Sequence, residues 1–516
     1  MATEHAAPVS TTDRDAADAA DLARYGYKQE LKRSLNIFSS FAVAFSYISP
    51  ATGIFTLFIL GIGTLGGAFF WTWPVVWLGQ FIVALVFAEV STHFPLAGSV
   101  FQWTKYLTKS KAYAWYAGWV YLWAGALTVA AVVATLPLAL IPMIDNLGID
   151  AIKMDPANLT NQKWIAVITL IVITLLNIFG VRLVALINNT GVLFEILGLF
   201  VFAIILAAFN DHQGVGVVFH TGGPAFNASN FLIAMFMGLF VIYGFDTAST
   251  LAEESHEPRK KAPRAVLASI AAAGVIGGVF IWAMLMAVPG SMHKVVAAGG
   301  ISPPDIIDAN LSNALSVGYL LVVSIAIFVC CLSIQASTIR LAFGMSRDRQ
   351  LPQSRLWSQV NHSTGTPIGA CILVAVMAGI FLLKYAGVAY IAIAATGMIY
   401  LSYLFATVAI MRMRLRGWPH EKGDFSLGRW GILVNALAIL WGLSMLVNFA
   451  WHRVATNPKA SEISSLDFFH SGFLNSIPIL WLILGVVLLL GTAYYLVRRA
   501  RIPSPVVTEA AAAEAT

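Results

Sequence analysis

The chain has 516 residues, of which 59% are hydrophobic and only 11% are charged, and its mean hydropathy is +0.78. Soluble domains are about 25% charged, so this composition excludes a water-soluble protein and favours one that crosses a membrane many times. The net charge of +6 comes from basic residues in short loops between apolar stretches, which argues against a nucleic-acid-binding surface.

The N-terminal segment is rich in alanine and mixed in charge, and it lacks the apolar core of a secretory signal peptide. We expect it to form a cytoplasmic tail over residues 1–30. The remaining chain is expected to divide into a first five-span unit at 31–210, a second at 211–420, two further spans within 421–500 and a cytoplasmic C-terminal tail at 501–516.

Twelve apolar stretches approach the roughly 20 residues that a membrane-spanning helix needs. The predicted spans are 36–62, 67–89, 113–142, 164–180, 190–209, 231–253, 264–288, 316–344, 368–384, 387–411, 430–450 and 473–497. The segment 91–107 is too polar to cross the bilayer, and we expect it to lie along the membrane interface.

The basic residues indicate which way the chain is inserted. Successive loops between the predicted spans lie on alternate sides of the membrane. Only six of the 31 Lys and Arg residues fall in loops on the side opposite the two termini, and all others fall on the side of the termini. Loops on the cytoplasmic side are enriched in Lys and Arg. The sequence therefore predicts a multi-pass protein of the plasma membrane whose termini are both cytoplasmic.

Two predicted spans contain helix-breaking residues near their centres. The first carries "SYISPATGIF" at 46–55, and the sixth reads "FMGLFVIYGFDTASTLAEES". Proline removes a backbone donor and glycine relaxes the helix, and the freed polar groups cost several kcal/mol in lipid unless protein or water satisfies them. The first break alone is also compatible with an ordinary proline kink. Two breaks at corresponding places favour two repeats of opposite orientation.

The two breaks together suit a small zwitterionic molecule. Where a helix is interrupted, the free N–H groups of one half attract a carboxylate, and the free carbonyls of the other half attract an ammonium group or a small cation. The sequence shows no phosphate-binding loop, nucleophile constellation or metal-ligand spacing. It therefore predicts a binding or transport protein rather than an enzyme, with neither cofactor nor metal.

Several stretches resemble the amino acid–polyamine–organocation (APC) family. They are "YGFDTASTLAEESHEPRKKAPRAV" at 243–266, "RLAFGMSRDRQLP" at 340–352 with "TPIGA" at 366–370, and "FPLAGSVFQWTKYL" at 94–107. The stretch "SLNIFSSFAVAFSYISPATGIF" is most similar to the amino acid/choline branch. The resemblance implies an all-α integral membrane fold of twelve transmembrane helices, with a LeuT-like five-plus-five inverted repeat and discontinuous helices 1 and 6. It also implies secondary active transport of an amino acid or amine.

The same resemblance implies a substrate site at the two breaks. The family motif of the first span falls on Ala51–Phe55, with alanine in place of its first glycine, and the aromatic gate of the sixth span falls on Phe240. Aromatic rings beside the second break could cover an amine by cation–π contact, worth roughly 0.5–2 kcal/mol. The predicted substrate-site residues are Ser49, Ala51, Thr52, Gly53, Phe240, Tyr243, Gly244, Phe245 and Asp246.

Three acidic residues of the sixth span have different expected roles. Asp246 directly follows the break, so it either caps the lower half-helix or contacts the substrate or a proton. Glu253 and Glu254 lie near the cytoplasmic end of the span. We expect them to pair with basic residues such as Arg33 and so to form a cytoplasmic gate.

Glu195 is the one charged residue in the fifth predicted span. In some proton-linked relatives a lysine stands at the matching position, and its amine takes the place of a sodium ion between spans one and eight. A carboxylate inside the membrane is costly and marks function, and burial favours its neutral form, which suits a proton carrier. Two alternatives remain: a structural glutamate held by hydrogen bonds, or a sodium ligand together with Ser333, Ser337 or Thr338.

Taken together, the sequence predicts a plasma-membrane permease that imports an amino acid or amine, such as γ-aminobutyrate, a choline-like compound or a polyamine, with proton coupling. An exchanger without ion coupling and a non-transporting membrane sensor of the same fold are the alternatives. The paired breaks and the buried carboxylate favour a transporter, because both are costly unless a ligand enters the cavity.

Overall fold

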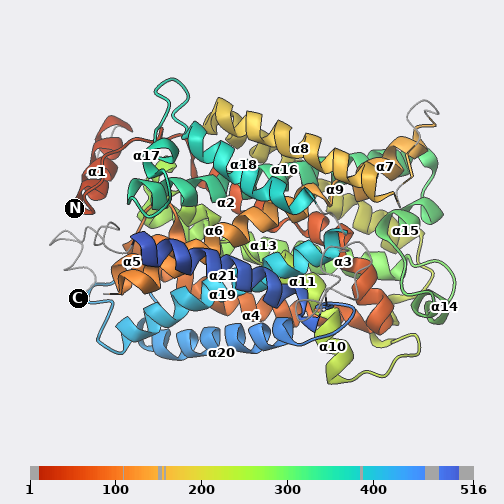
Figure 1. Ribbon diagram of the computed structural model, residues 1–516. Helices are drawn as coiled ribbons and strands as arrows, with labels where there is room; N and C mark the ends of the chain where they lie inside the picture. Colours follow the sequence, from red (N-terminus) through yellow and green to blue (C-terminus); the bar gives the residue numbers. More distant parts are fainter. Residues whose placement is uncertain are drawn as a thin grey trace, which may run out of the picture.

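The structure is a computed structural model that describes residues 11–108, 110–148, 154–155, 158–383, 387–459 and 476–498. The regular secondary structure of these residues is helical, with isolated bridges in place of strands. Most of the long helices run along one common direction and form a bundle (Figure 1). The predicted C-terminal tail at 501–516 lies outside the described residues.

The first half of the bundle corresponds to the predicted spans one to five. Its helices are α1 (Thr11–Arg24), α2 (Ile37–Ile48), α3 (Pro50–Leu65), η1 (Gly66–Trp71), α4 (Thr72–His93), α5 (Ser99–Leu107), α6 (Lys111–Val133), α7 (Pro137–Asn146), α8 (Leu159–Phe179) and α9 (Val181–Phe209).

The second half contains the predicted spans six to twelve. Its helices are η3 (Val215–Phe219), α10 (Ala228–Ala234), α11 (Phe236–Val241), α12 (Thr247–Thr250), η4 (Ala252–Glu254), α13 (Pro258–Met286), α14 (Met292–Ala297), α15 (Pro303–Asn310), α16 (Asn313–Arg347), α17 (Ser354–Trp357), α18 (Ile368–Leu383), α19 (Val388–Arg414), η5 (Gly428–Trp430), α20 (Gly431–Ala450) and α21 (Ile479–Arg498).

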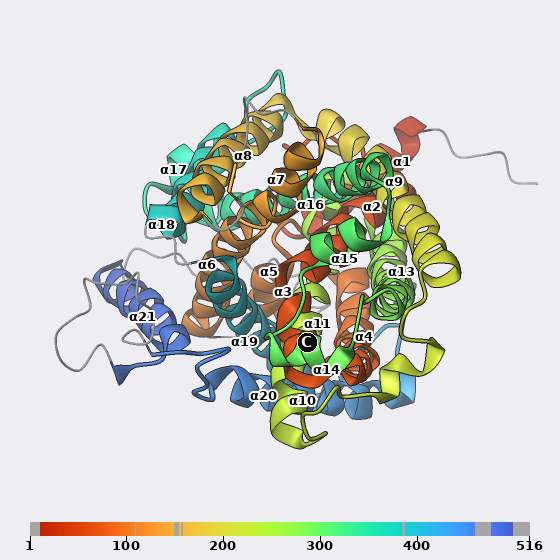
Figure 2. The same cartoon turned by 90° about the vertical axis from the view of Figure 1, so that its right-hand side faces the viewer.

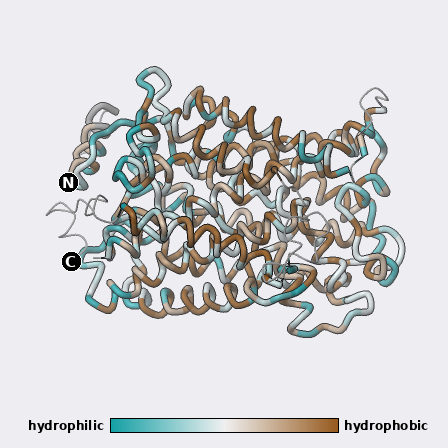
Figure 3. Tube along the Cα trace, in the orientation of Figure 1, coloured by the Kyte–Doolittle hydropathy of each residue, from teal (hydrophilic) through white to brown (hydrophobic). Residues whose placement is uncertain are grey.

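The described helices have the length and composition of a multi-pass membrane protein. Nine helical stretches in this part of the chain are long and apolar enough to cross a bilayer, and two shorter apolar stretches lie at Ala228–Val241 and Ile368–Leu383. Hydrophobic residues cover the length of the bundle, while hydrophilic ones gather at its two ends (Figure 3). The count of twelve spans and the inverted repeat stay predictions.

The outer helices expose apolar side chains, as expected for a surface that faces lipid. Ile168 and Leu175 of α8 are 59% and 50% exposed, and Leu197 of α9 is 62% exposed. Lipid covers such a surface more favourably than water, because exposed apolar side chains cost free energy in water. The core of the bundle instead contains α3 and α11, which lie near the centre when the molecule is viewed along its long axis (Figure 2).

Residues 91–107 are buried among other helices, and their position at the membrane interface stays a prediction. Helix α5 is buried over its whole length and packs against α6 and α19. Its polar groups have partners inside the protein: Ser99 donates a hydrogen bond to Asp246 at 2.7 Å, and Lys105 binds Asp348 at 2.7 Å. A polar segment can therefore be buried here because the surrounding helices satisfy its hydrogen-bonding groups.

The described beginning and end of the chain lie at the same end of the bundle. Tyr27 donates a hydrogen bond to Asp348 at the end of α16, at 2.7 Å. Arg498, the last described residue, lines a surface hollow together with Arg349 and Arg355 from the segment that follows α16. This arrangement agrees with an even number of spans, and the cytoplasmic location of both ends stays a prediction.

Candidate substrate site

The break in the first span is a single residue between α2 and α3. A residue that precedes proline is disfavoured in the right-handed helical conformation, and Ser49, with φ 35° and ψ 90°, lies outside it. Pro50 occupies the first position of α3, where its missing N–H is not needed. The Ser49 hydroxyl accepts a hydrogen bond from the Thr52 N–H at 3.3 Å and so caps α3.

The break in the sixth span is wider and separates α11 from α12. Gly244, in its centre, has φ +86°, and a Cβ atom there would lie 1.9 Å from the ring of Tyr47. Both the left-handed backbone and the close approach of that ring require glycine. The freed N–H of Gly244 donates to the Tyr403 hydroxyl at 2.9 Å, so a side chain of α19 replaces the missing helical partner.

The two broken segments meet in the centre of the bundle. A Cβ atom on Gly53 would lie 1.9 Å from Cγ2 of Val241, so α3 touches α11. The rings of Tyr47 and Tyr243 are 6.1 Å apart across the two breaks. The two broken segments therefore face each other in the structure, as the sequence predicts.

A small closed cavity lies between these segments. Its volume of about 10 Å³ holds about one water molecule, so the site is too small for an amino acid in this conformation. Four predicted site residues line it, together with side chains of α2, α6, α11 and α16. These four are Thr52, Gly53, Phe240 and Tyr243.

The other predicted substrate-site residues lie behind this cavity. Phe245 packs against Phe87 of α4 and Tyr403 of α19, with ring centroids 5.9 and 5.5 Å away. It therefore does not cover the cavity as the sequence analysis expected. Ser49 and Ala51 face Glu195 instead.

The carboxylate of Glu195 occupies the break in the first span. Its Oε1 atom accepts hydrogen bonds from the Ser49 hydroxyl at 2.8 Å and from the Ala51 N–H at 3.2 Å, and the side chain is only 2% exposed. The N-terminus of a helix attracts negative charge. Glu195 thus takes the position that the sequence analysis assigned to the carboxylate of a substrate.

The three hydroxyl residues of α16 that the sequence analysis grouped with Glu195 have other partners. Ser333 donates to Asn188 at 3.0 Å, Ser337 accepts from Thr247 at 3.3 Å, and Thr338 donates to the carbonyl of Ile334 at 2.8 Å. None of these contacts joins a hydroxyl to the Glu195 carboxylate. The contacts therefore give no support to a sodium site built from these groups.

Asp246 holds together the elements around the second break. Its side chain makes no capping hydrogen bond to α12. Instead it accepts hydrogen bonds from Ser99 at 2.7 Å, Tyr121 at 2.6 Å and Tyr403 at 2.5 Å. The structure therefore does not support the capping interpretation. The carboxylate, which is wholly buried, joins the break to α5, α6 and α19.

Comparison with known proteins decides the family. Residues 35–462 match the amino acid permease family. The chain belongs to this family, a branch of the APC superfamily. It is 28% identical to the amino-acid permease BAT1 of Arabidopsis thaliana, over 83% of this chain and 87% of the relative, and 28% identical to the BAT1 homolog of Oryza sativa, over 84% and 87%. It is also 25% identical to the choline transporter of Saccharomyces cerevisiae, over 87% of this chain and 80% of the relative.

In this amino acid permease, Glu253 and Glu254 form ion pairs, but not with Arg33. Arg347 binds Glu253 through two hydrogen bonds of 2.7 and 2.8 Å, and Arg340 binds Glu254 at 2.8 Å. Arg33 donates instead to the carbonyl of Ser255 at 2.8 Å. Both arginine partners lie within the family-like stretch "RLAFGMSRDRQLP", whose pattern alone does not indicate what its arginines bind.

A second layer of contacts covers these ion pairs. The guanidinium of Arg347 stacks 3.8 Å from the ring centre of Tyr27, whose hydroxyl binds Asp348. Lys105 of α5 also binds Asp348, and although burial lowers the pKa of Lys105, the neighbouring carboxylate opposes that effect. The chain ahead of α2 therefore packs against α5 and α16 at this end of the permease.

Proposed function

We propose that the protein is a secondary active transporter that imports an amino acid or amine across the plasma membrane, coupled to protons. Membership of the amino acid permease family supports this, as do relatives named amino-acid permease and choline transporter. The candidate substrates are amino acids such as γ-aminobutyrate, choline-like compounds and polyamines. In the proposed topology, twelve spans form two inverted five-span units and two further helices, and both termini are cytoplasmic.

The contact between Glu195 and the first break supports this function most strongly. The carboxylate binds Ser49, and the Ser49 hydroxyl lies 2.7 Å from that of Thr52, which lines the central cavity. A charged carboxylate accepts hydrogen bonds about twice as strongly as a neutral group. Protonation of Glu195 therefore weakens its hold on Ser49 and Ala51, and it frees their donors for the carboxylate of a substrate.

The closed cavity suits one step of a transport cycle. Because the space between the breaks holds about one water molecule, substrate entry requires the half-helices to separate. The ion pairs of Glu253 and Glu254 close the end that we propose to be cytoplasmic. For this end to open, both ion pairs must either break or move as intact units with their helices. In this proposal the two pairs are therefore the cytoplasmic gate.

Glu195→Gln is expected to abolish proton-driven accumulation while leaving exchange of substrate for substrate largely intact. At one proton per substrate, a gradient of one pH unit can drive about tenfold accumulation, since 1.36 kcal/mol corresponds to a factor of ten. The glutamine retains the size of the side chain but cannot carry a proton. Uptake and counterflow into proteoliposomes, with and without a pH gradient, measure both quantities.

Glu421→Gln, which removes an exposed carboxylate, serves as the control and is expected to retain accumulation. Equal loss of accumulation and exchange in Glu195→Gln would indicate a structural role for Glu195. If the unsubstituted protein accumulates substrate with a sodium gradient but not with a pH gradient, sodium is the coupling ion. Exchange without accumulation under either gradient would identify an uncoupled exchanger. If the unsubstituted protein shows neither exchange nor accumulation, the membrane sensor is the remaining interpretation.

A further inference from the structure

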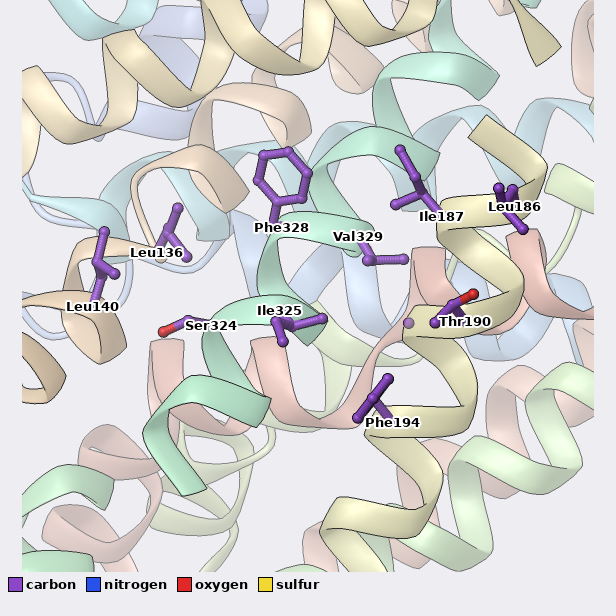
Figure 4. Close-up of a pocket in the computed structure, with 11 residues that line it drawn as sticks. Leu136, Leu140, Leu186, Ile187, Thr190, Phe194, Ser324, Ile325, Phe328 and Val329 are labelled. Atoms are coloured by element: carbon purple, nitrogen blue, oxygen red, sulfur yellow. The ribbon is translucent and has the colours of Figure 1, made fainter. Parts of the chain in front are cut away.

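An apolar groove opens on the side of the bundle between α9, α16 and the turn from α6 to α7. Phe194 of α9 and Ile325 and Phe328 of α16 line its middle, and Leu140 and Leu186 lie at opposite ends (Figure 4). Its volume of about 500 Å³ lies in the range of about 300–1,000 Å³ that is typical of small-molecule sites. Its position among lipid-facing helices makes it accessible from the membrane.

A basic hollow of about 470 Å³ lies beside the beginning of α9. It contains Arg33, Arg182 and His256 together with polar side chains of the segment that leads into α2. Arg182 is exposed and has no ion-pair partner among the described residues. The Ser34 hydroxyl and the side-chain amide oxygen of Asn189 have no hydrogen-bond partner in the described structure.

One acidic side chain, Asp18, offsets part of the positive charge of Arg33. Asp18 lies 3.5 Å from the Arg33 guanidinium, which also donates to the carbonyl of Ser255. Arg182 forms no ion pair with a described residue that would offset its charge. The hollow therefore offers a guanidinium group and a hydroxyl donor to an anion with several oxygen atoms, such as a phosphate group.

The apolar groove and the basic hollow are continuous along α9. Leu186 lines both of them. Arg182, Leu186, Thr190 and Phe194 follow one another at four-residue intervals and are all exposed, so they share one face of the helix. Twelve residues of helix span about 18 Å, which leads from the bundle end towards the middle of the membrane.

We propose that one anionic phospholipid of the surrounding membrane binds along this face of α9. Its phosphate group lies in the basic hollow at Arg182, and one acyl chain fills the apolar groove. The assignment to the cytoplasmic leaflet rests on the topology proposed with the transport function. Anionic lipids of that leaflet are attracted to basic pockets between membrane helices.

The bound lipid would act on the part of α9 that carries Glu195. Residues 191 and 195 are buried on the inner side of α9, behind the exposed face that carries the lipid. A Cβ atom on Gly191 would lie 2.4 Å from Cγ2 of Val329, so α9 and α16 touch at the floor of the groove. An acyl chain that packs over this contact holds the two helices together and stabilises the folded protein.

The test is a titration of the purified full-length protein in detergent with phosphatidylglycerol. Unfolding temperature and native mass spectrometry report binding, and neither readout requires transport. We expect phosphatidylglycerol to raise the unfolding temperature and to remain bound, and phosphatidylcholine with the same acyl chains to do neither. Arg182→Gln is expected to weaken apparent phosphatidylglycerol affinity about tenfold, because a charged hydrogen-bond donor is lost.

A second variant tests the groove itself. Ile325→Trp fills the groove and is expected to reduce phosphatidylglycerol binding to a similar extent. The matched controls are Arg416→Gln, at an exposed position after α19, and Leu321→Trp, at a position of α16 that is 47% exposed and outside the groove. Both controls should bind like the unsubstituted protein. Dihexanoyl phosphatidylglycerol, whose chains are too short for the groove, should bind weakly, and this result does not depend on the folding of any variant.

Three outcomes would overturn the proposal. Equal stabilisation by phosphatidylcholine would remove the role of the phosphate charge. A shift with inorganic phosphate alone that matches that of phosphatidylglycerol would indicate a small-anion site. Unchanged phosphatidylglycerol binding in both Arg182→Gln and Ile325→Trp would place the lipid elsewhere. Because these readouts are separate from pH-driven uptake, a failure here is distinct from a failure of proton coupling at Glu195.

Discussion

Arg340→Ala is expected to destabilise the protein by about 3–5 kcal/mol, because it leaves the Glu254 carboxylate charged and buried without its partner. Both side chains of this pair have 0% exposure, and their closest atoms are 2.8 Å apart. Solvent does not reach the Glu254 carboxylate while the pair is intact, so Arg340 is its main source of compensating charge. The free energy of unfolding in detergent, measured by denaturant titration, gives the size of the effect.

Two comparisons isolate the buried pair as the cause. Lys261→Ala removes a pair of 3.1 Å whose side chains are 21% and 32% exposed, and it should cost at most about 1 kcal/mol. The double variant with Arg340→Leu and Glu254→Leu removes both charges and should be more stable than Arg340→Ala alone. If Arg340→Ala costs no more than Lys261→Ala, the buried pair does not hold this end of the bundle together.

Asp246→Asn is expected to lower the free energy of unfolding by about 1.5–3 kcal/mol and to slow transport. The amide has one acceptor oxygen, whereas the carboxylate accepts hydrogen bonds from three hydroxyl groups at its two oxygen atoms. At least one hydroxyl then faces an amide donor. Unfolding titrations and initial uptake rates on the same preparations measure both effects.

The tyrosine partners of Asp246 provide a matched pair of variants. Tyr121→Phe removes one hydroxyl from the carboxylate, whereas Tyr403→Phe also removes the acceptor of the Gly244 N–H. An unsatisfied buried N–H costs about 1–3 kcal/mol, so Tyr403→Phe should be the more damaging. Equal effects of the two variants, or full stability of Asp246→Asn, would contradict the role of this network at the second break.

The helices and the two breaks could be predicted because their causes are local. An apolar stretch in lipid must satisfy its own backbone, so hydropathy alone indicates where helices lie. Pro50 disfavours the helical conformation at the residue before it, Gly244 permits a left-handed backbone, and the structure interrupts the helices next to both. Glu195 also stood out, as one carboxylate in an otherwise apolar span.

The partners of these residues could not be predicted, because they come from distant parts of the chain. Asp246 binds hydroxyl groups from residues 99, 121 and 403, and no local pattern connects these positions. The burial of α5 depends on the same contacts, which a hydropathy profile does not contain. Arg340 and Arg347 lay within a recognised motif, but the motif did not indicate that they bind Glu254 and Glu253.

The position of the substrate between the two broken helices can be tested by measuring substrate affinity in two variants. A thermal-shift screen of amino acids and amines first identifies a ligand that stabilises the unsubstituted protein. Thr52→Val removes a cavity hydroxyl and Phe240→Ala removes a cavity ring, and each is expected to weaken binding of that ligand roughly tenfold. Thr64→Val, on the same helix as Thr52 but outside the cavity, should bind normally. Unchanged affinity in both cavity variants would show that the substrate does not bind between the breaks.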